Sequence, residues 1–255
     1  MSLPRSRILV TNDDGINAPG LKILENIALS LSDDVWIVAP ESDQSASSHS
    51  LTLTLPLRVR KLESRRFAVN GTPADSVLLG VQHIIEGNRP DLVLSGVNAG
   101  ANLGKDVTYS GTVAAAMEGA LLGIRSIALS QTRVFGEDVI WQPAQKFGPD
   151  IVRKLYTEGW PHKTLMNINF PNKPMDEIRN IEITVQGRRK VGDAITTGRD
   201  PRGYEFVWIG TERREDRTFK GSDVKAVYEG RISVTPLSLD LTDYRSVKCL
   251  QALFS

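Results

Sequence analysis

The stretch ILVTNDDG at residues 8–15 decides the fold class of this chain. Its first three residues are all apolar and leave no polar face, which predicts a strand buried on both sides. Apolar residues then recur at helical spacing between Leu21 and Leu31, and a second apolar run follows at residues 35–38. A buried strand, a helix and another buried strand in this order are typical of a parallel βαβ unit.

The same alternation continues through the first two-thirds of the chain. Further buried strands are predicted at 92–94, 127–129 and 165–170, and further helices at 76–85, 113–122 and 144–156. We therefore predict an α/β fold with three layers, in which helices cover both faces of a doubly wound, mostly parallel sheet. This Rossmann-like core is expected to span residues 1–180.

Two segments depart from this pattern. Leucines at every second position of residues 50–59 indicate strand periodicity, and we expect a hairpin arm at about residues 50–60. Beyond residue 180 the chain becomes rich in Gly, Arg and Lys, with isolated strands predicted at 204–209 and 232–236 and a short terminal helix. We expect residues 181–255 to form an extension with a β-hairpin used in oligomerisation, and not an independent domain.

Composition argues against several classes of partner and excludes two kinds of site, although local basic clusters stay possible. The 255 residues carry 31 Lys and Arg against 30 Asp and Glu, and the net charge of +1 argues against binding to duplex nucleic acid or an anionic membrane. A single cysteine, Cys249, excludes an intramolecular disulfide and a zinc site of several thiolates. No run approaches the roughly 18 apolar residues that cross a bilayer, so a soluble, cytoplasmic protein is expected.

Asp13 and Asp14 directly follow the first predicted strand. Ligands of an open parallel sheet bind beyond the carboxyl ends of its strands, and carboxylates are oxygen ligands suited to Mg²⁺ or Mn²⁺. The alternative is that Asp-Asp-Gly merely forms a turn.

Two other strand ends add oxygen-bearing side chains. Ser45 and His49 lie in the polar loop after the second strand, and Asn98 and Asn102 follow the strand at 92–94. Two adjacent carboxylates repel each other in a partly dry crevice unless a cation lies between them, which favours a metal site. His49 could protonate a leaving group, although a loop histidine without a visible partner is more often incidental.

The segment Tyr109-Ser110-Gly111-Thr112 precedes the helix predicted at 113–122. Ser110 could simply be the N-cap of that helix. A helix amino terminus with a glycine and two hydroxyls also suits a phosphate group, because it offers unpaired N–H groups and a favourable dipole. Metal ligands and an anion site at one sheet edge together indicate phosphoryl chemistry. The chain has neither a P-loop motif nor a G-x-S-x-G nucleophile elbow.

Eight short motifs, in order along nearly the whole chain, resemble those of the survival protein SurE family. They are LVTNDDG (9–15), VAP (38–40), GTPAD (71–75), SGVN (95–98), YSGTVAAAMEG (109–119), DPRG (200–203), WIG (208–210) and SVTPL (233–237). One departure lies in the loop after the second strand, where Gln44 and Ala46 flank Ser45 and many members have arginine and glycine. This departure puts the substrate preference in question.

The resemblance implies a phosphatase that acts on nucleoside 5′- and 3′-monophosphates, with some members also trimming polyphosphate. It implies one divalent cation per subunit, Mg²⁺ or Mn²⁺, and a homodimer or homotetramer built partly by exchanged carboxy-terminal segments. Residues implied in metal binding are Asp13, Asp14, Ser45 and Asn98, and those implied in phosphate binding are Asn102, Ser110, Gly111 and Thr112. Asp13 or Asp14 would also orient or deprotonate the attacking water.

Three rival interpretations are considered. A haloacid-dehalogenase-type phosphatase has its two aspartates at i and i+2, whereas here they are adjacent. A response-regulator receiver needs a phospho-accepting aspartate after a middle strand, where this chain has Ser95-Gly96-Val97-Asn98. A nucleotide- and metal-binding stress protein without catalysis would use the same scaffold, and retention of the whole residue set argues against it.

Overall fold

A computed structural model describes residues 6–134, 136–161, 163–192, 194–210 and 213–254. Within these ranges nine strands form one sheet, in the order β3-β4-β2-β1-β5-β6-β7-β13-β8. Their bounds are β1 (Ile8–Thr11), β2 (Val35–Pro40), β3 (Val59–Glu63), β4 (Arg66–Val69), β5 (Leu92–Ala99), β6 (Arg125–Gln131), β7 (Thr164–Phe170), β8 (Ile181–Ile183) and β13 (Ile232–Ser238). The six strands from β4 to β7 in this order are parallel, and the antiparallel pairs β3–β4 and β7–β13 flank them.

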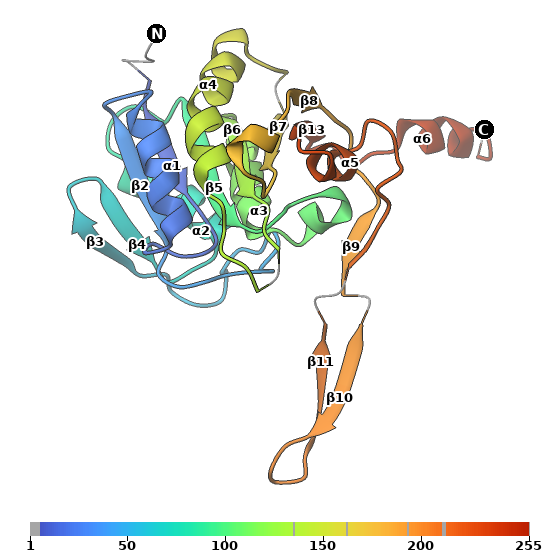
Figure 1. The fold of residues 1–255 in the computed structure, drawn as a ribbon. Helices are drawn as coiled ribbons and strands as arrows, with labels where there is room; N and C mark the ends of the chain where they lie inside the picture. Colours follow the sequence, from blue (N-terminus) through green and yellow to red (C-terminus); the bar gives the residue numbers. More distant parts are fainter. Residues whose placement is uncertain (1–5, 135, 162, 193, 211–212, 255) are drawn as a thin grey trace.

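Helices cover both faces of this sheet (Figure 1). They are α1 (Pro19–Leu29), α2 (Pro73–Leu79) with a π-helical turn η1 (Gly80–Ile84), α3 (Gly111–Leu121), α4 (Gln142–Glu158) and α5 (Asp223–Tyr228). A further helix, α6 (Tyr244–Gln251), has no buried residue and lies away from the sheet (Figure 1). Alternate residues of β1 pack on opposite sides: Ile8 and Val10 join the core under α1 and α4, whereas Leu9 joins the core under α2 and α3. This arrangement confirms the predicted three-layer, doubly wound α/β fold. None of the described helices combines the length and the apolar character needed to cross a membrane.

The chain beyond residue 180 is partly built into the core. β13 pairs antiparallel with β7, and β8 pairs with β13, so this segment supplies two strands of the main sheet. The segment between β8 and α5 projects as two short antiparallel ribbons (Figure 1), β9 (Arg189–Val191) with β12 (Arg213–Glu215) and β10 (Ile195–Arg199) with β11 (Glu205–Ile209).

A hairpin lies further along the chain than the arm predicted at about residues 50–60. Residues 50–58 form no strand, and the hairpin begins at Val59, where β3 pairs antiparallel with β4. The segment is fixed by side-chain bonds: the backbone N–H and hydroxyl of Thr52 both donate to the carboxylate of Asp75 on α2, at 3.0 and 2.7 Å. The alternating leucines therefore lie on an extended loop, and Leu53 and Leu55 are exposed.

Candidate functional site

The candidate site lies at the switch point of the sheet, where the chain stops adding strands on one side of β1 and begins to add them on the other. β1 pairs with β2 on one side and with β5 on the other, so the loops that follow these three strands meet at one sheet edge. Gly15 turns the chain there with φ of +99°, and a Cβ on it would lie 3.1 Å from the backbone of Ser42. The backbone N–H of Gln44 donates to the carbonyl oxygen of Asp13 at 2.8 Å. The loop after β2 is thereby held against the Asp13–Asp14 pair, as the sequence predicts.

Asp13 is buried, with 4% of its surface exposed, and its carboxylate meets the first turn of α3. Its Oδ1 accepts a hydrogen bond of 2.6 Å from the Thr112 hydroxyl. Burial, with a smaller contribution from the charge of Asp14, raises the pKa of Asp13 to about 7, although hydrogen bonds from Thr112 oppose the rise. The ionised form of the Asp13 carboxylate is therefore destabilised in the folded protein, and a nearby cation would stabilise it.

Asp14 is half-buried, and its Oδ2 accepts a hydrogen bond of 3.1 Å from the backbone N–H of Ala99 at the end of β5. Burial raises the pKa of Asp14 above its ordinary value, and the charge of Asp43 adds to the rise. The Ala99 N–H and the charge of Arg133 act in the opposite direction. Asp43 and Arg133 thus belong to the electrostatic surroundings of the pair, a contribution that sequence analysis missed.

The structure at the start of α3 explains the sequence Ser110-Gly111-Thr112. Ser110 is the N-cap, since its Oγ accepts the backbone N–H of Val113 at 3.0 Å. A Cβ on Gly111 would lie 2.8 Å from the Cβ of Asp13, so only glycine lets the helix end approach this closely. Both interpretations of the segment are compatible with this geometry: the helix is capped, and its amino terminus faces a negatively charged group.

The residues around the pair suit an oxygen-liganded divalent cation. The described part of the chain has no group of three or more His, Cys, Asp or Glu side chains that could hold a metal ion. Two carboxylates would therefore need neutral oxygen ligands to complete a site. Asn98 can supply one, because its Nδ2 donates to the carbonyl of Gly100 at 2.9 Å and its Oδ1 is left to bind a cation. Ser45 is exposed on the loop held at Asp13, and its hydroxyl donates to Asp43 at 2.6 Å.

Asn102 has a different environment from the other predicted phosphate ligands. Its side-chain Nδ2 donates to the hydroxyl of Ser130 at 2.8 Å, and its backbone N–H donates to the Asn169 side chain. The amides of Asn167 and Asn169 donate in turn to its carbonyl. These bonds join the loop after β5 to the strands β6 and β7, which gives Asn102 a structural role. Its contact with phosphate stays a prediction.

His49, which has no partner visible in the sequence, has one in the fold. Its Nε2 lies 2.9 Å from Oε2 of Glu118 on α3, 69 positions further along the chain. In the same loop Ala46 and Ser48 have φ of 61° and 53°, a left-handed conformation that side-chain-bearing residues seldom adopt. Ala46 occupies the position where many SurE members have glycine.

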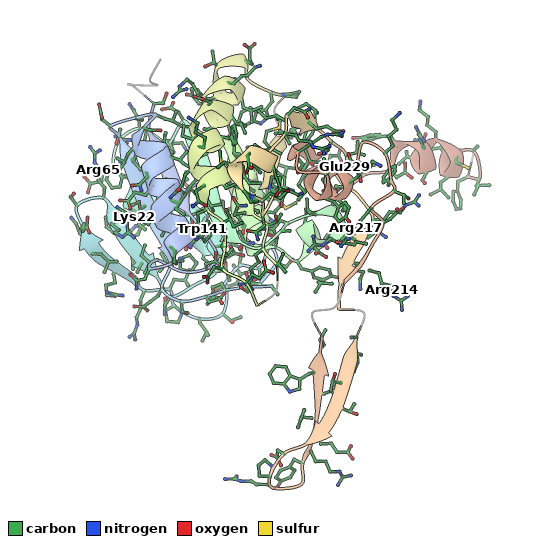
Figure 2. The ribbon with its side chains drawn as sticks, viewed as in Figure 1. Lys22, Arg65, Trp141, Arg214, Arg217 and Glu229 are labelled. Atoms are coloured by element: carbon green, nitrogen blue, oxygen red, sulfur yellow. The ribbon has the colours of Figure 1, made fainter. Side chains whose placement is uncertain are left out.

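A cleft of about 550 Å³ opens beside Asp14. It is lined by Asp14, Ala18, Pro19, Gly20, Ala99, Asp138, Val139 and Trp141. Trp141 lies close to the start of α1 (Figure 2), where a Cβ on Gly20 would come within 3.2 Å of its ring. The cleft thus offers an apolar and aromatic surface next to the carboxylate pair.

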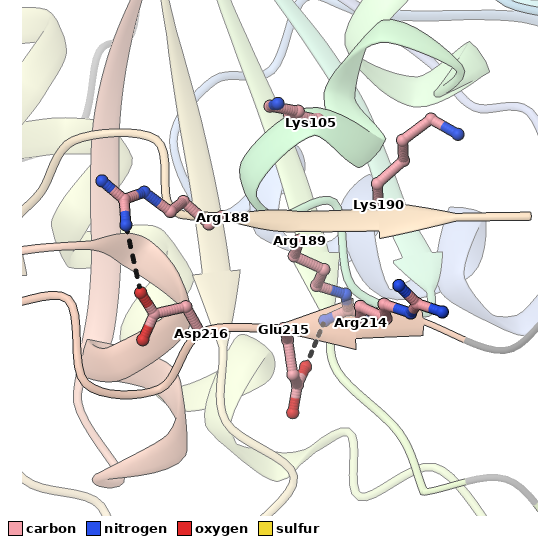
Figure 3. Close-up of a pocket in the computed structure, with 7 residues that line it drawn as sticks. All are labelled: Lys105, Arg188, Arg189, Lys190, Arg214, Glu215 and Asp216. Carbon is pink, nitrogen blue, oxygen red and sulfur yellow. Dashed lines mark ion pairs between the residues drawn. The ribbon is translucent and has the colours of Figure 1, made fainter. Parts of the chain in front are cut away.

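A second pocket, of about 360 Å³, lies at the β9–β12 ribbon and contains none of the predicted site residues (Figure 3). Its lining residues are Lys105, Arg188, Arg189, Lys190, Arg214, Glu215 and Asp216. Carboxylates lie beside two of its arginines: Arg188 is 3.6 Å from Asp216, and Arg189 is 3.0 Å from Asp106. We interpret this pocket as the ion-paired base of the ribbon.

A doubly wound sheet with two carboxylates and a helix amino terminus at its switch point defines a class of α/β proteins with a polar site at the carboxyl ends of their strands. Comparison with known proteins gives the family. The model of the family "Survival protein SurE" matches residues 8–193. The chain belongs to this family.

Relatives match over nearly the full chain. A protein of Paramagnetospirillum magneticum named 5′-nucleotidase SurE is 58% identical and covers 97% of this chain and 95% of its own. The protein of the same name from Caulobacter vibrioides is 53% identical, with 97% and 95% covered. The crystal structure of a SurE protein from Aquifex aeolicus is 44% identical, has a TM-score of 0.85, and covers 98% of this chain and all of its own.

Proposed function

We propose that this chain is a divalent-metal-dependent nucleotidase that hydrolyses nucleoside 5′-monophosphates, and also 3′-monophosphates, to nucleoside and phosphate. The nucleotidase activity is supported by family membership and by close relatives named 5′-nucleotidase. The observation that carries the proposal is the bond from Thr112 to Asp13, because it joins the carboxylate pair to the amino terminus of α3.

The metal would be held by Asp13, Asp14, Ser45 and Asn98, one Mg²⁺ or Mn²⁺ per subunit. Support comes from the raised pKa of both carboxyls, which marks two negative charges that a cation would stabilise, and from the oxygen that Asn98 leaves available. Bound there, the cation supplies Lewis acidity toward a phosphoryl oxygen and acidifies a bound water.

The protein groups of the site bind the substrate phosphate and the proton. We assign phosphate binding to Ser110, Gly111 and Thr112, because the helix dipole and backbone N–H groups at the start of α3 stabilise negative charge on phosphoryl oxygens. Asn102 completes the predicted set. Asp13 or Asp14 orients the attacking water and accepts its proton; in Asp14, Oδ1 is the oxygen not engaged by the Ala99 N–H.

The cleft beside Asp14 is the place we propose for the nucleoside. A phosphate at the carboxylate pair leaves the base and ribose to extend into a neighbouring space, and this cleft adjoins Asp14. Trp141 offers a face for base stacking, and the carboxylate of Asp138 can accept a hydrogen bond from a ribose hydroxyl or a base amino group.

Phosphate release from a panel of substrates tests this function. The panel contains 5′- and 3′-monophosphates of several nucleosides, with ribose 5-phosphate as a control that lacks the base. We expect metal-dependent release from the nucleotides, and a KM for nucleotides that rises about tenfold in Trp141→Ala, since stacking is worth about 1–3 kcal/mol per base. The KM for ribose 5-phosphate should not change. Metal-dependent binding of nucleotides without release would instead indicate the non-catalytic binding protein.

We further propose a cytoplasmic homodimer or homotetramer in which the β10–β11 ribbon contacts another subunit. The ribbon projects from the body of the molecule (Figure 1), and its exposed apolar residues support the proposal. They are Ile195, Phe206, Val207, Trp208 and Ile209.

A further inference from the structure

The loop after β2 is attached to the site at three successive points. The backbone N–H of Gln44 donates to the carbonyl of Asp13 at 2.8 Å. Four residues on, Ser48 binds the chain just before α3: its N–H donates to the carbonyl of Tyr109 at 3.2 Å, and its hydroxyl donates to that of Thr108 at 2.8 Å. The third point is the contact between His49 and Glu118. Ser45 lies between the first two.

The backbone between these points is strained. Ala46 and Ser48 both adopt left-handed φ values, 61° and 53°, although neither is glycine. Such residues keep this conformation only where the surrounding structure holds them in it, and strain of this kind concentrates at functional sites. The backbone at position 46 thus has a conformation suited to glycine, although the residue there is alanine. A contact elsewhere in the loop has to stabilise this conformation.

The contact of His49 with Glu118 is suited to that task. Glu118 is only 7% exposed and lies on α3, the same helix whose first turn binds Asp13. A buried carboxylate needs a hydrogen-bonding partner, so the pair fixes the position of both side chains. The helix that positions Asp13 thereby also anchors the far end of the loop that carries Ser45.

We infer that His49 is a positioning residue, whose hydrogen bond to Glu118 holds the strained loop of residues 41–49 against the Asp13–Asp14 pair and keeps Ser45 in place to bind the metal. His49 needs no role as an acid in this account. The inference rests on the proposed function for its effect on metal binding, but its effect on the loop itself is independent of that function.

The test compares His49→Ala with His83→Ala, a matched control at an exposed histidine on η1. In the metal-free proteins, hydrogen exchange of the Gln44 and Ser48 amides reports whether the loop stays docked. Titration calorimetry with Mn²⁺ alone reports metal affinity, and kinetics at saturating metal separate kcat from KM. We expect His49→Ala to exchange these amides at least tenfold faster, to bind Mn²⁺ at least tenfold more weakly, and to change KM little. His83→Ala should match the wild type in every measurement.

Two rescue variants separate positioning from general stability. His49→Asn retains a side-chain donor and should recover part of the Mn²⁺ affinity. Adding Ala46→Gly to His49→Ala should recover most of it, because glycine adopts the left-handed conformation without strain. Unchanged amide exchange in His49→Ala would overturn the inference, as would a loss of Mn²⁺ affinity that Ala46→Gly leaves unaltered. A wild type that neither binds Mn²⁺ nor releases phosphate would refute the proposed function, and amide exchange would still decide the role of His49.

Discussion

The ionised form of the Asp13 carboxyl group is less stable in the folded, metal-free protein than in the unfolded chain. Its pKa is raised from 3.8 to about 7, so the folded state binds more protons than the unfolded state between those values. The stability that this carboxyl contributes is therefore fully present below pH 3.8 and is lost as the pH rises through about 7.

We predict that Asp13→Asn stabilises the metal-free protein at pH 8 by a few kcal/mol, since each pKa unit corresponds to about 1.4 kcal/mol. The advantage over the wild type should vanish near pH 4. Urea unfolding in the presence of a chelator, at a series of pH values, measures it, with the exposed Asp150→Asn as control. A gap that grows toward low pH would contradict the cause we give for the raised pKa.

At the scale of single elements, the start of α2 anchors the long loop before β3. The buried carboxylate of Asp75 accepts hydrogen bonds from the N–H of Thr72 and from both the N–H and hydroxyl of Thr52. The Thr72 hydroxyl also accepts the N–H of Asp75, which completes a capping box. Asp75 thus supplies one half of the capping box of α2 and also holds the loop.

Asp75→Ala should lower the free energy of unfolding by about 3 kcal/mol, because it removes one half of the capping box and leaves three partly buried donors without their acceptor. Chemical unfolding measures the loss, and Asp150→Ala, on the exposed face of α4, is the matched control. Equal stability of the two variants would show that the Asp75 network contributes nothing.

The elements differ in how far the sequence predicts them. Strands such as β1 and β2 begin with short apolar runs, at residues 8–10 and 35–38, and the helices carry clear apolar periodicity, so the doubly wound core follows from pattern alone. The alternation of leucines at 50–59 misleads, because a contact with Asp75 on another element decides its conformation.

The candidate site also has a part that the sequence predicts and a part that it does not. Asp13, Asp14 and Asn98 stand at predictable strand ends, and Ser110 stands at a predictable helix start. The contact of His49 with Glu118 and the cleft at Trp141 depend on how distant segments pack. Neither has a local sequence signal, so only the three-dimensional structure could bring them to light.

At the scale of the whole molecule, the projecting β10–β11 ribbon carries apolar side chains that a subunit interface would cover (Figure 1). We predict that the double change Trp208→Ser and Ile209→Ser shifts the protein to a smaller assembly and leaves the sheet core folded. Light scattering after size-exclusion chromatography measures the mass. Leu121→Ser, an exposed leucine on α3, is the control. An unchanged mass in the double variant would remove the ribbon from the interface.

The central claim is that the Asp13–Asp14 pair, loaded with a divalent cation, hydrolyses a nucleoside monophosphate. Its most direct test is phosphate release from one such nucleotide by chelator-treated wild type and Asp14→Asn, with Mg²⁺, Mn²⁺ or no metal added back. We predict no release without metal, restored release in the wild type, and turnover lower by at least two orders of magnitude in a folded Asp14→Asn. Metal-independent release, or full activity in Asp14→Asn, would contradict the account.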